Sequence, residues 1–148
     1  MFKHILIPTD GSAVANKAVK AGIQLAKNLG AKVTGYYAIE TLPTEIYGEG
    51  YLISNSKMVK SLQQRARDIG KKHLENIAKV AAAAGVPFGE VMTLAETPYD
   101  GIVEAAKKQK CDAIFMASHG RSGLADLVLG SVTRKVLTHS KLPVLVYR

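Results

Sequence analysis

Cysteines, histidine clusters and long apolar runs are all scarce in this chain of 148 residues. Cys111 is the single cysteine, which excludes an internal disulfide framework and is typical of proteins kept in a reducing cytosol. Histidine and cysteine are not clustered, so a structural zinc site is not expected. Because no window reaches about 18 consecutive apolar residues, no membrane span is predicted, and residues 1–8 have a strand pattern instead of a signal peptide. We therefore expect a cytoplasmic protein.

Acidic residues are outnumbered by basic ones, 12 against 20, which gives a net charge of +8. Such a surplus indicates either attraction to a polyanion or solvated helix faces. The basic residues are spread from Lys3 to Arg148, and no basic stripe with interleaved aromatic residues is present. We therefore interpret the charge as solvated surface, and nucleic acid is not an expected partner.

The apolar pattern alternates between short β-type runs and helical stretches along the chain. The predicted strands are 4–8, 32–39, 88–94, 113–117 and 143–147, and the predicted helices are 14–29, 62–84, 98–106 and 131–139. Asp10 or Ser12 can cap the first helix, and Gly30 closes it. This alternation predicts one α/β domain, residues 1–148, with a parallel sheet covered by helices on both faces. Residues 40–54 are predicted to form a loop that could close over a ligand or contact another chain.

A glycine-bearing segment joins the strand at 113–117 to the helix at 131–139. It holds Gly120, Gly123 and Gly130, and Ser131 opens the helix. Glycine loops turn N–H groups inward and helix starts add unpaired donors, so the segment is suited to holding phosphate. A flexible loop tip is the alternative interpretation. Neither a Walker-type P-loop nor a G-x-G-x-x-G dinucleotide fingerprint is present.

Polar residues after the first and fourth strands are candidates for ligand contact. Asp10 could bind a ribose, a base or a cation, or it could cap the next helix, and Thr9 shares this ambiguity. For His119 we favour a loop-stabilising or phosphate-proximal role over general-base catalysis, whereas Arg121 is either a phosphate ligand or a solvated residue. Ligands bind parallel sheets where the strand order reverses, so these residues share a crevice only if strands one and four are adjacent.

Taken together, these segments resemble the universal stress protein family over essentially the whole chain. The resemblance rests on residues 5–12 (ILIPTDGS), 118–124 (SHGRSGL), 129–132 (LGSV) and 143–146 (PVLV). It implies a five-stranded parallel sheet with helices on both faces, of the adenine nucleotide alpha hydrolase-like, Rossmann-like type, with strand order 3-2-1-4-5. It also implies homodimers joined through the last strand, here Val144, Leu145 and Val146, and ATP binding in part of the family.

The ATP-binding branch of that family carries a glycine motif that this chain matches at three of its four positions. The aligned residues are Ala117, Gly120, Gly130 and Ser131, so alanine replaces the first glycine. Alanine is tolerated there if its φ is negative and is strained if its φ is positive. By position, residues 8–10 would meet the adenosine, Ala38 the adenine, and residues 130–133 the phosphates of ATP, with or without Mg²⁺. The predicted site comprises Pro8, Thr9, Asp10, Ala38, Met116, Ala117, His119, Gly120, Arg121, Gly130, Ser131, Val132 and Thr133.

Three functional classes remain open. The leading interpretation is an ATP-binding, dimeric stress-response sensor or regulator. The second is a dimerising interaction module that binds no nucleotide, which Ala117 favours. The third is a slow ATPase or phosphotransferase, but the chain offers no Walker lysine, obvious base or metal-binding carboxylate pair, and Asp126 is the one acid near the loop besides Asp10. We assign no catalytic residue and no metal ligand.

Overall fold

The structure, a computed structural model, describes residues 1–41, 56–121 and 129–148. Most of the loop predicted at 40–54 lies outside these residues, as do Gly123 and Asp126. Within those ranges, no helix combines the length and the apolar character that crossing a bilayer requires.

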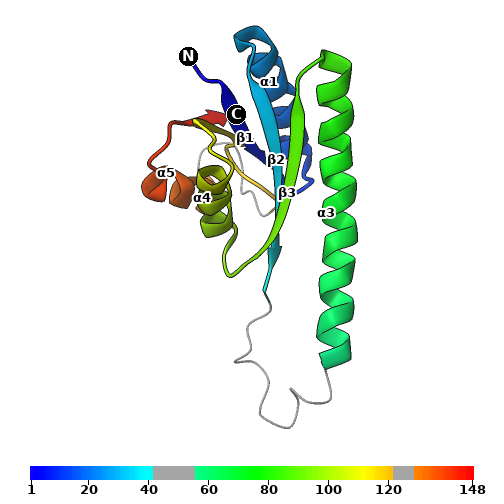
Figure 1. Cartoon of the computed structure of the whole chain (residues 1–148). Coiled ribbons are helices and arrows are strands. Elements are labelled where there is room, and N and C mark those ends of the chain that lie inside the picture. The colour runs from blue at the N-terminus through cyan, green and yellow to red at the C-terminus, as the bar shows by residue number, and fades with distance from the viewer. Residues whose placement is uncertain (42–55, 122–128) are drawn as a thin grey trace.

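Five parallel strands form one sheet at the centre of the fold (Figure 1). They are β1 His4–Pro8, β2 Lys32–Glu40, β3 Phe88–Ala95, β4 Ala113–Ala117 and β5 Val144–Tyr147. Their order is β3-β2-β1-β4-β5, which confirms the prediction. β1 pairs with β2 on one side and with β4 on the other, so the strand order reverses between β1 and β4. The exits of the first and fourth strands are therefore neighbours, as the predicted crevice requires.

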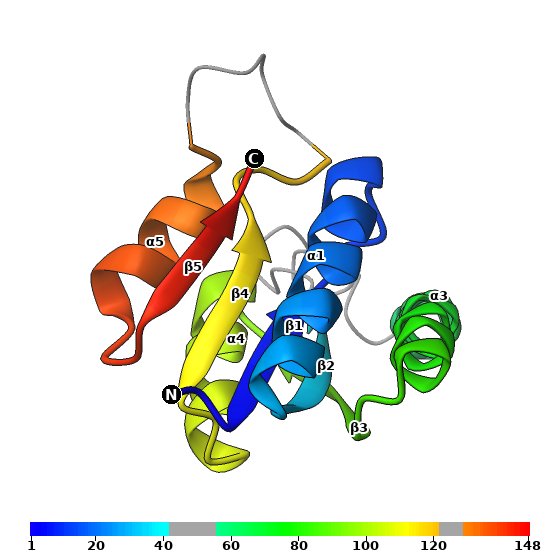
Figure 2. The same cartoon turned by 90° about the horizontal axis from the view of Figure 1, so that it is seen from above.

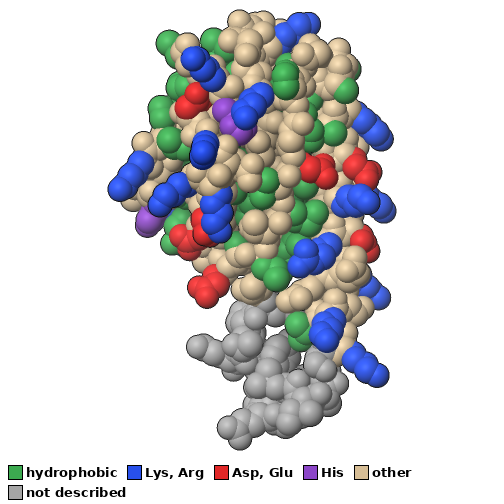
Figure 3. Space-filling model, in the orientation of Figure 1, with side chains coloured by type: hydrophobic (Ala, Val, Ile, Leu, Met, Phe, Trp, Pro, Cys, Tyr) green, Lys and Arg blue, Asp and Glu red, His purple; other side chains and the backbone are tan. Residues whose placement is uncertain are grey.

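The helices cover both faces of the sheet. They are α1 Ala13–Leu29, α3 Ser56–Ala84, α4 Pro98–Lys108 and α5 Ser131–His139. α1 and α3 lie on one face, and α4 and α5 lie on the other (Figure 2). On the face drawn in Figure 3, the basic side chains are spread over several elements and mixed with acidic ones, as solvated helix faces would be.

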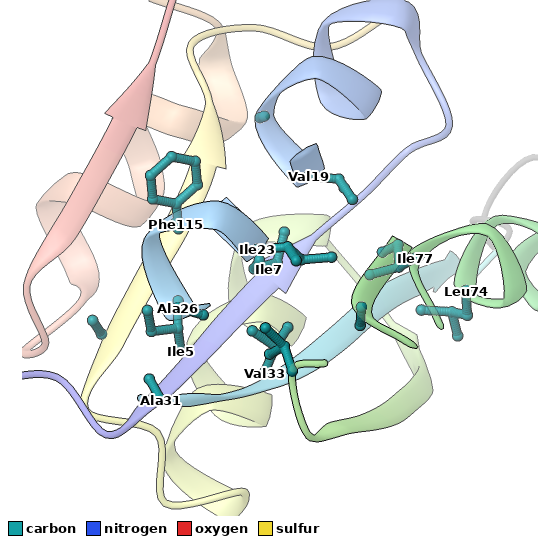
Figure 4. Close-up of a cluster of buried hydrophobic side chains, with 14 of the residues drawn as sticks. Ile5, Ile7, Val19, Ile23, Ala26, Ala31, Val33, Leu74, Ile77 and Phe115 are labelled. Carbon is teal, nitrogen blue, oxygen red and sulfur yellow. The ribbon is translucent and has the colours of Figure 1, made fainter. Parts of the chain in front are cut away.

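β1 is buried on both sides because each face of the sheet carries its own hydrophobic core. Ile5 and Ile7 belong to the cluster that α1 and α3 cover (Figure 4), whereas Leu6 belongs to the cluster that α4 and α5 cover. All three side chains are 0% exposed. Successive side chains of a strand point to opposite faces, so a strand covered on both sides needs an unbroken apolar run. The run at 4–8 is therefore explained by its central place in the sheet.

The ends of the helices follow the predicted signals with two refinements. Ser12, and not Asp10, is the N-cap of α1, and its hydroxyl accepts a backbone N–H one turn later at 3.2 Å. Gly30 closes α1 in the left-handed conformation, with a φ of 64°. α3 begins at Ser56, earlier than its predicted start at position 62. Its first turns bury little apolar surface, since Met58 is 56% exposed, so the apolar period is weak there.

Candidate functional site

A cavity of about 720 Å³ lies at the carboxyl ends of β1, β2 and β4, beside the start of α5. Ordinary small-ligand pockets measure about 300–1,000 Å³, so this volume is typical of them. All thirteen residues of the predicted site line it, namely Pro8, Thr9, Asp10, Ala38, Met116, Ala117, His119, Gly120, Arg121, Gly130, Ser131, Val132 and Thr133. The fold thus gathers residues 8–10, 116–117, 119–121 and 130–133 around one space, although 111 positions separate Asp10 from Arg121.

The start of α5 presents unpaired backbone donors at the wall of this cavity. Gly130 is the N-cap, with φ −58° and ψ 153°, and it has no side chain with which to cap the helix. The next three amides, those of Ser131, Val132 and Thr133, have no intrahelical partner. Nor do they donate to any other group in the described part of the chain. The first turn of α5 also holds no acidic residue, so no carboxylate of that turn compensates the positive end of the helix dipole.

Two hydrogen bonds hold the start of α5 against the end of β4. The Gly130 N–H donates to the Ser118 carbonyl at 2.8 Å, and the Thr133 hydroxyl donates to the Ala117 carbonyl at 3.0 Å. Thr133 is only 2% exposed, and its hydroxyl hydrogen is already engaged in this bond to Ala117. Ser131, by contrast, is exposed. A Cβ at Gly130 would lie 3.0 Å from the Cα of His119, which explains why glycine stands at this close approach of two backbones.

Ala117, which replaces the first glycine of the family motif, fits its position without backbone strain. It is the last residue of β4 and is buried. Lys110 is the one non-glycine residue with positive φ in the described ranges, so Ala117 does not need the conformation that favours glycine. The methyl group therefore weakens the nucleotide interpretation only if it contacts the ligand directly.

Asp10 ties the two loops at the rim of the cavity together. Its Oδ1 accepts the Ser12 N–H at 2.9 Å, and its Oδ2 accepts the Arg121 N–H at 2.9 Å. The Arg121 side chain completes the contact, because Nε donates to the Asp10 carbonyl at 2.8 Å and Nη2 donates to the same oxygen. We call these contacts the Asp10–Arg121 clasp. Burial alone would raise the pKa of Asp10, but the hydrogen bonds from Ser12 and Arg121 and the Arg121 charge outweigh it and hold the pKa below its usual value.

Glycine at position 120 makes the clasp possible. A Cβ there would lie 2.5 Å from Asp10 Oδ2, well inside van der Waals contact. Thr9 supports the same turn, because its buried hydroxyl accepts the Gly11 N–H at 3.1 Å. The side chains of Thr9 and Asp10 are thus both bonded to backbone groups of the loops that they border.

His119 lies against Ser118, with 3.0 Å between the His119 Nδ1 and the Ser118 Oγ. No carboxylate is hydrogen-bonded to His119 anywhere in residues 1–41, 56–121 and 129–148. A histidine that works as a general base is usually oriented by such a group. The geometry is therefore more compatible with a loop-stabilising role.

Several residues of the cavity wall were not predicted from the sequence. Apolar residues including Tyr36, Ile39, Pro98 and Ile102 also line the cavity. Their periodicity was that of ordinary core residues, so no local signal marked them. Arg134, an exposed residue in the first turns of α5, lines it as well. A cation near a helix N-terminus is repelled by the helix dipole unless an anion binds there. The basic residue at this helix start was therefore the feature of the sequence that could have predicted its place at the site.

Comparison with known proteins connects this geometry to a family. The whole chain, residues 1–148, matches the model of the universal stress protein family. The universal stress protein MJ0531 of Methanocaldococcus jannaschii is 35% identical over 149 residues, which cover 100% of this chain and 83% of that protein. The solved structure of MJ0577 from the same organism has a TM-score of 0.82 and 30% identity, covering 99% of this chain and 95% of its own. A universal stress protein solved in complex with cAMP has a TM-score of 0.71 and 26% identity, covering 99% and 97%.

Proposed function

Because the chain belongs to the universal stress protein family, we propose that it binds an adenine nucleotide, ATP, in the cavity at the carboxyl ends of β1 and β4. The phosphates lie at the start of α5, and the adenosine lies between the turn at residues 8–10 and Ala38. The bound nucleotide makes the protein a sensor or regulator in the stress response. The observation that carries this proposal is the uncapped start of α5 at the cavity wall.

The donors at that helix start contribute a large share of the binding energy that a micromolar Kd requires. Ser131, Val132 and Thr133 offer three unpaired amides, and Arg134 adds a cation nearby. A hydrogen bond to a charged group contributes about 1.5–3 kcal/mol. Three such bonds give roughly 4.5–9 kcal/mol, and a micromolar Kd corresponds to about 8 kcal/mol. Contacts to the rest of the nucleotide must then offset the entropy lost on association.

The apolar residues of the cavity lining suit a nucleoside. They include Ala38, Ile39, Pro98, Ile102 and Met116, which offer apolar contact to a flat base. The relative of known structure that was solved with cAMP supports an adenine ring as the occupant. A cavity that combines apolar lining residues with a helix start lacking a side-chain cap matches a ligand with an apolar ring at one end and phosphate at the other.

We assign the nucleotide a regulatory and not a catalytic use. Both carboxylate oxygens of Asp10 accept backbone N–H groups, and His119 bonds to Ser118, so neither is poised to activate a water molecule. A slow ATPase would instead release phosphate in proportion to protein concentration, and His119→Ala would abolish that release.

Isothermal titration with ATP, with and without Mg²⁺, tests the binding site. Wild-type protein should bind with saturable stoichiometry. Gly130→Ala should raise the Kd about tenfold, since the added Cβ pushes the start of α5 away from His119 and costs roughly one phosphate hydrogen bond of about 1.4 kcal/mol. The matched control is Gly89→Ala, where an added Cβ meets only Thr34 Oγ1 at 3.9 Å, and its Kd should equal that of the wild type.

The proposal would be contradicted if the wild type binds no ATP with or without Mg²⁺ and the Gly130→Ala and Gly89→Ala proteins fold and behave alike. Mass spectrometry of the denatured, freshly purified protein gives an independent check. Co-purified adenine nucleotide supports the site. A second function, a dimerising interaction module without nucleotide, is favoured if none is found and binding partners are retained.

The dimer proposed with this function places β5 at the interface. β5 lies at the edge of the sheet, where Val144, Leu145 and Val146 are only half-buried. An apolar edge strand has free backbone groups and can pair with its copy in a second chain. Sedimentation velocity should show a dimer at tens of micromolar, and Val146→Lys should shift it to monomer. A wild-type monomer at that concentration would refute the assignment.

A further inference from the structure

We propose that His73 is a positioning residue of the nucleotide site, which holds the Asp10–Gly11 turn and makes the Asp10–Arg121 clasp, and nucleotide affinity with it, depend on pH. The effect of His73 on nucleotide affinity rests on the proposed function. The effect of His73 on the clasp needs no nucleotide and is tested separately.

His73 packs directly against the turn that carries Asp10. It lies on α3, far from residues 9–11 in the chain. A Cβ at Gly11 would overlap its ring, with Cε1, Nε2 and Nδ1 all within 2.6 Å. Gly11 has a φ of 78°, so glycine is needed there both for its backbone and for this contact. The imidazole therefore occupies the space that a side chain at position 11 would take.

The charged and aromatic groups around His73 come from three other segments. Asp10 of the β1 turn and Arg121 of the segment after β4 both act on it electrostatically, and the Tyr37 ring of β2 lies 5.9 Å away at 33°. His73 is itself half-buried. Burial lowers its pKa, the Arg121 guanidinium lowers the pKa further, and the Asp10 carboxylate opposes both. The clasped arrangement therefore favours the neutral imidazole.

The sign of the pH effect follows from that preference. A proton on His73 puts a second cation near Arg121 while that guanidinium is bonded to the Asp10 carbonyl. Protonation is easier when Arg121 moves away, so by linkage acid favours the open clasp. The clasp is therefore most favoured above the ordinary histidine pKa of about 6.5 and becomes less favoured as the pH falls below it. If the clasped state binds ATP, affinity falls over the same range.

Titration calorimetry with ATP at about pH 7.5 and about pH 5.5 tests the effect on affinity. His73→Asn removes the titrating group, and His139→Asn is the matched control on an exposed histidine at the end of α5. The ATP phosphates also titrate in this range, so the measured quantity is the ratio of the two Kd values in each protein. This ratio should be at least about fivefold larger in wild type and His139→Asn than in His73→Asn. Equal ratios in all three proteins would overturn the proposal.

NMR of the ligand-free protein separates this inference from the proposed function. The Arg121 amide, which is bonded to Asp10 Oδ2, should titrate with the same midpoint as the His73 ring protons, and His73→Asn should remove that inflection. Asp10 itself does not titrate there, because its pKa is lowered. An Arg121 amide that is insensitive between about pH 8 and 5.5 would refute the role of His73, whether or not ATP binds. If the protein shows the inflection but binds no ATP, only the proposed function fails.

A second pair of variants guards against a His73→Asn protein that does not fold. Gly11→Ala should displace the imidazole and shift the Arg121 amide, because the new methyl group overlaps the ring. Adding His73→Ala should reverse the part of that shift that the steric overlap causes, since the space is then free, whereas the backbone strain at the positive φ of residue 11 is the same in both backgrounds. An Arg121 amide that responds to Gly11→Ala equally in both backgrounds would show that His73 does not transmit the change.

Discussion

Adding one methyl group at Gly120 should break the bond from the Arg121 N–H in the Asp10–Arg121 clasp while leaving the stability of the protein nearly unchanged. The new Cβ would lie 2.5 Å from Asp10 Oδ2, so this oxygen has to retreat by about 0.9 Å to reach ordinary contact. The Arg121 N–H bond to the same oxygen, now 2.9 Å, would lengthen to roughly 3.8 Å, which is no longer a hydrogen bond.

The free energy of unfolding reflects two opposing effects. A hydrogen bond to a carboxylate is worth about 1.5–3 kcal/mol, but this one lies at an exposed rim, so we expect a loss of about 1 kcal/mol. Gly120 does not have a positive φ, so alanine at this position restricts the unfolded chain and stabilises by about 0.4–1 kcal/mol. The net change should therefore lie within about 0.5 kcal/mol of zero in urea unfolding.

The clasp itself should respond clearly. Loss of the Arg121 hydrogen bond should move the pKa of Asp10 upward toward its ordinary value, followed by NMR of its carboxyl carbon. A carboxyl group with a lowered pKa stabilises the folded protein above the unfolded pKa of about 3.9, and this stabilisation is lost as the pH falls through the folded pKa. The Gly120→Ala protein should therefore lose less stability in acid than the wild type does. The Kd for ATP should rise about fivefold, which corresponds to about 1 kcal/mol.

A double-mutant cycle with Asp10→Ala provides the decisive control. Without the carboxylate there is nothing for the new methyl group to displace, so in that background Gly120→Ala should change the Arg121 amide only by the small amount that any substitution of the preceding residue causes. If Gly120→Ala leaves the Asp10 pKa unchanged and shifts the Arg121 amide no more than it does in the Asp10→Ala background, the close contact at the rim does not exist and the reasoning is refuted.

Three further predictions concern buried groups outside the clasp. Thr133→Val should cost about 1–3 kcal/mol in urea unfolding, because it leaves the buried Ala117 carbonyl without its 3.0 Å partner; a change below about 0.5 kcal/mol would contradict this role. Burial lowers the pKa of His4, so its contribution to the free energy of unfolding should be fully present above about pH 6.5 and fall below that pH. His4→Asn should flatten this pH dependence, and an unchanged dependence would show that another group causes it. Burial raises the pKa of Cys111 to about 11, so a thiol reagent at about pH 8 should label it only as fast as the protein unfolds, and rapid native labelling would refute its protection.

Residue identity was enough to predict which segments surround the cavity, but not what each polar group does there. All thirteen predicted residues line the cavity, yet the side chains of Asp10 and Thr133 are hydrogen-bonded to backbone groups of the protein itself. A carboxylate after a strand looks the same in a sequence whether it faces a ligand or a loop amide. The distance to Arg121 decides between these roles, and that distance depends on how two segments 111 positions apart are packed.

The sequence alone determined the order and type of the elements, the glycine and serine residues that end the helices, and the burial of β1 on both faces. These follow from apolar periods and backbone preferences, which act over a few neighbouring residues. Only the tertiary structure decided that Asp10 would be clasped by Arg121 and that His73 would occupy the space beside Gly11. Both depend on contacts at van der Waals distance between segments that meet only when the sheet and its helices assemble, and no local preference encodes such a contact.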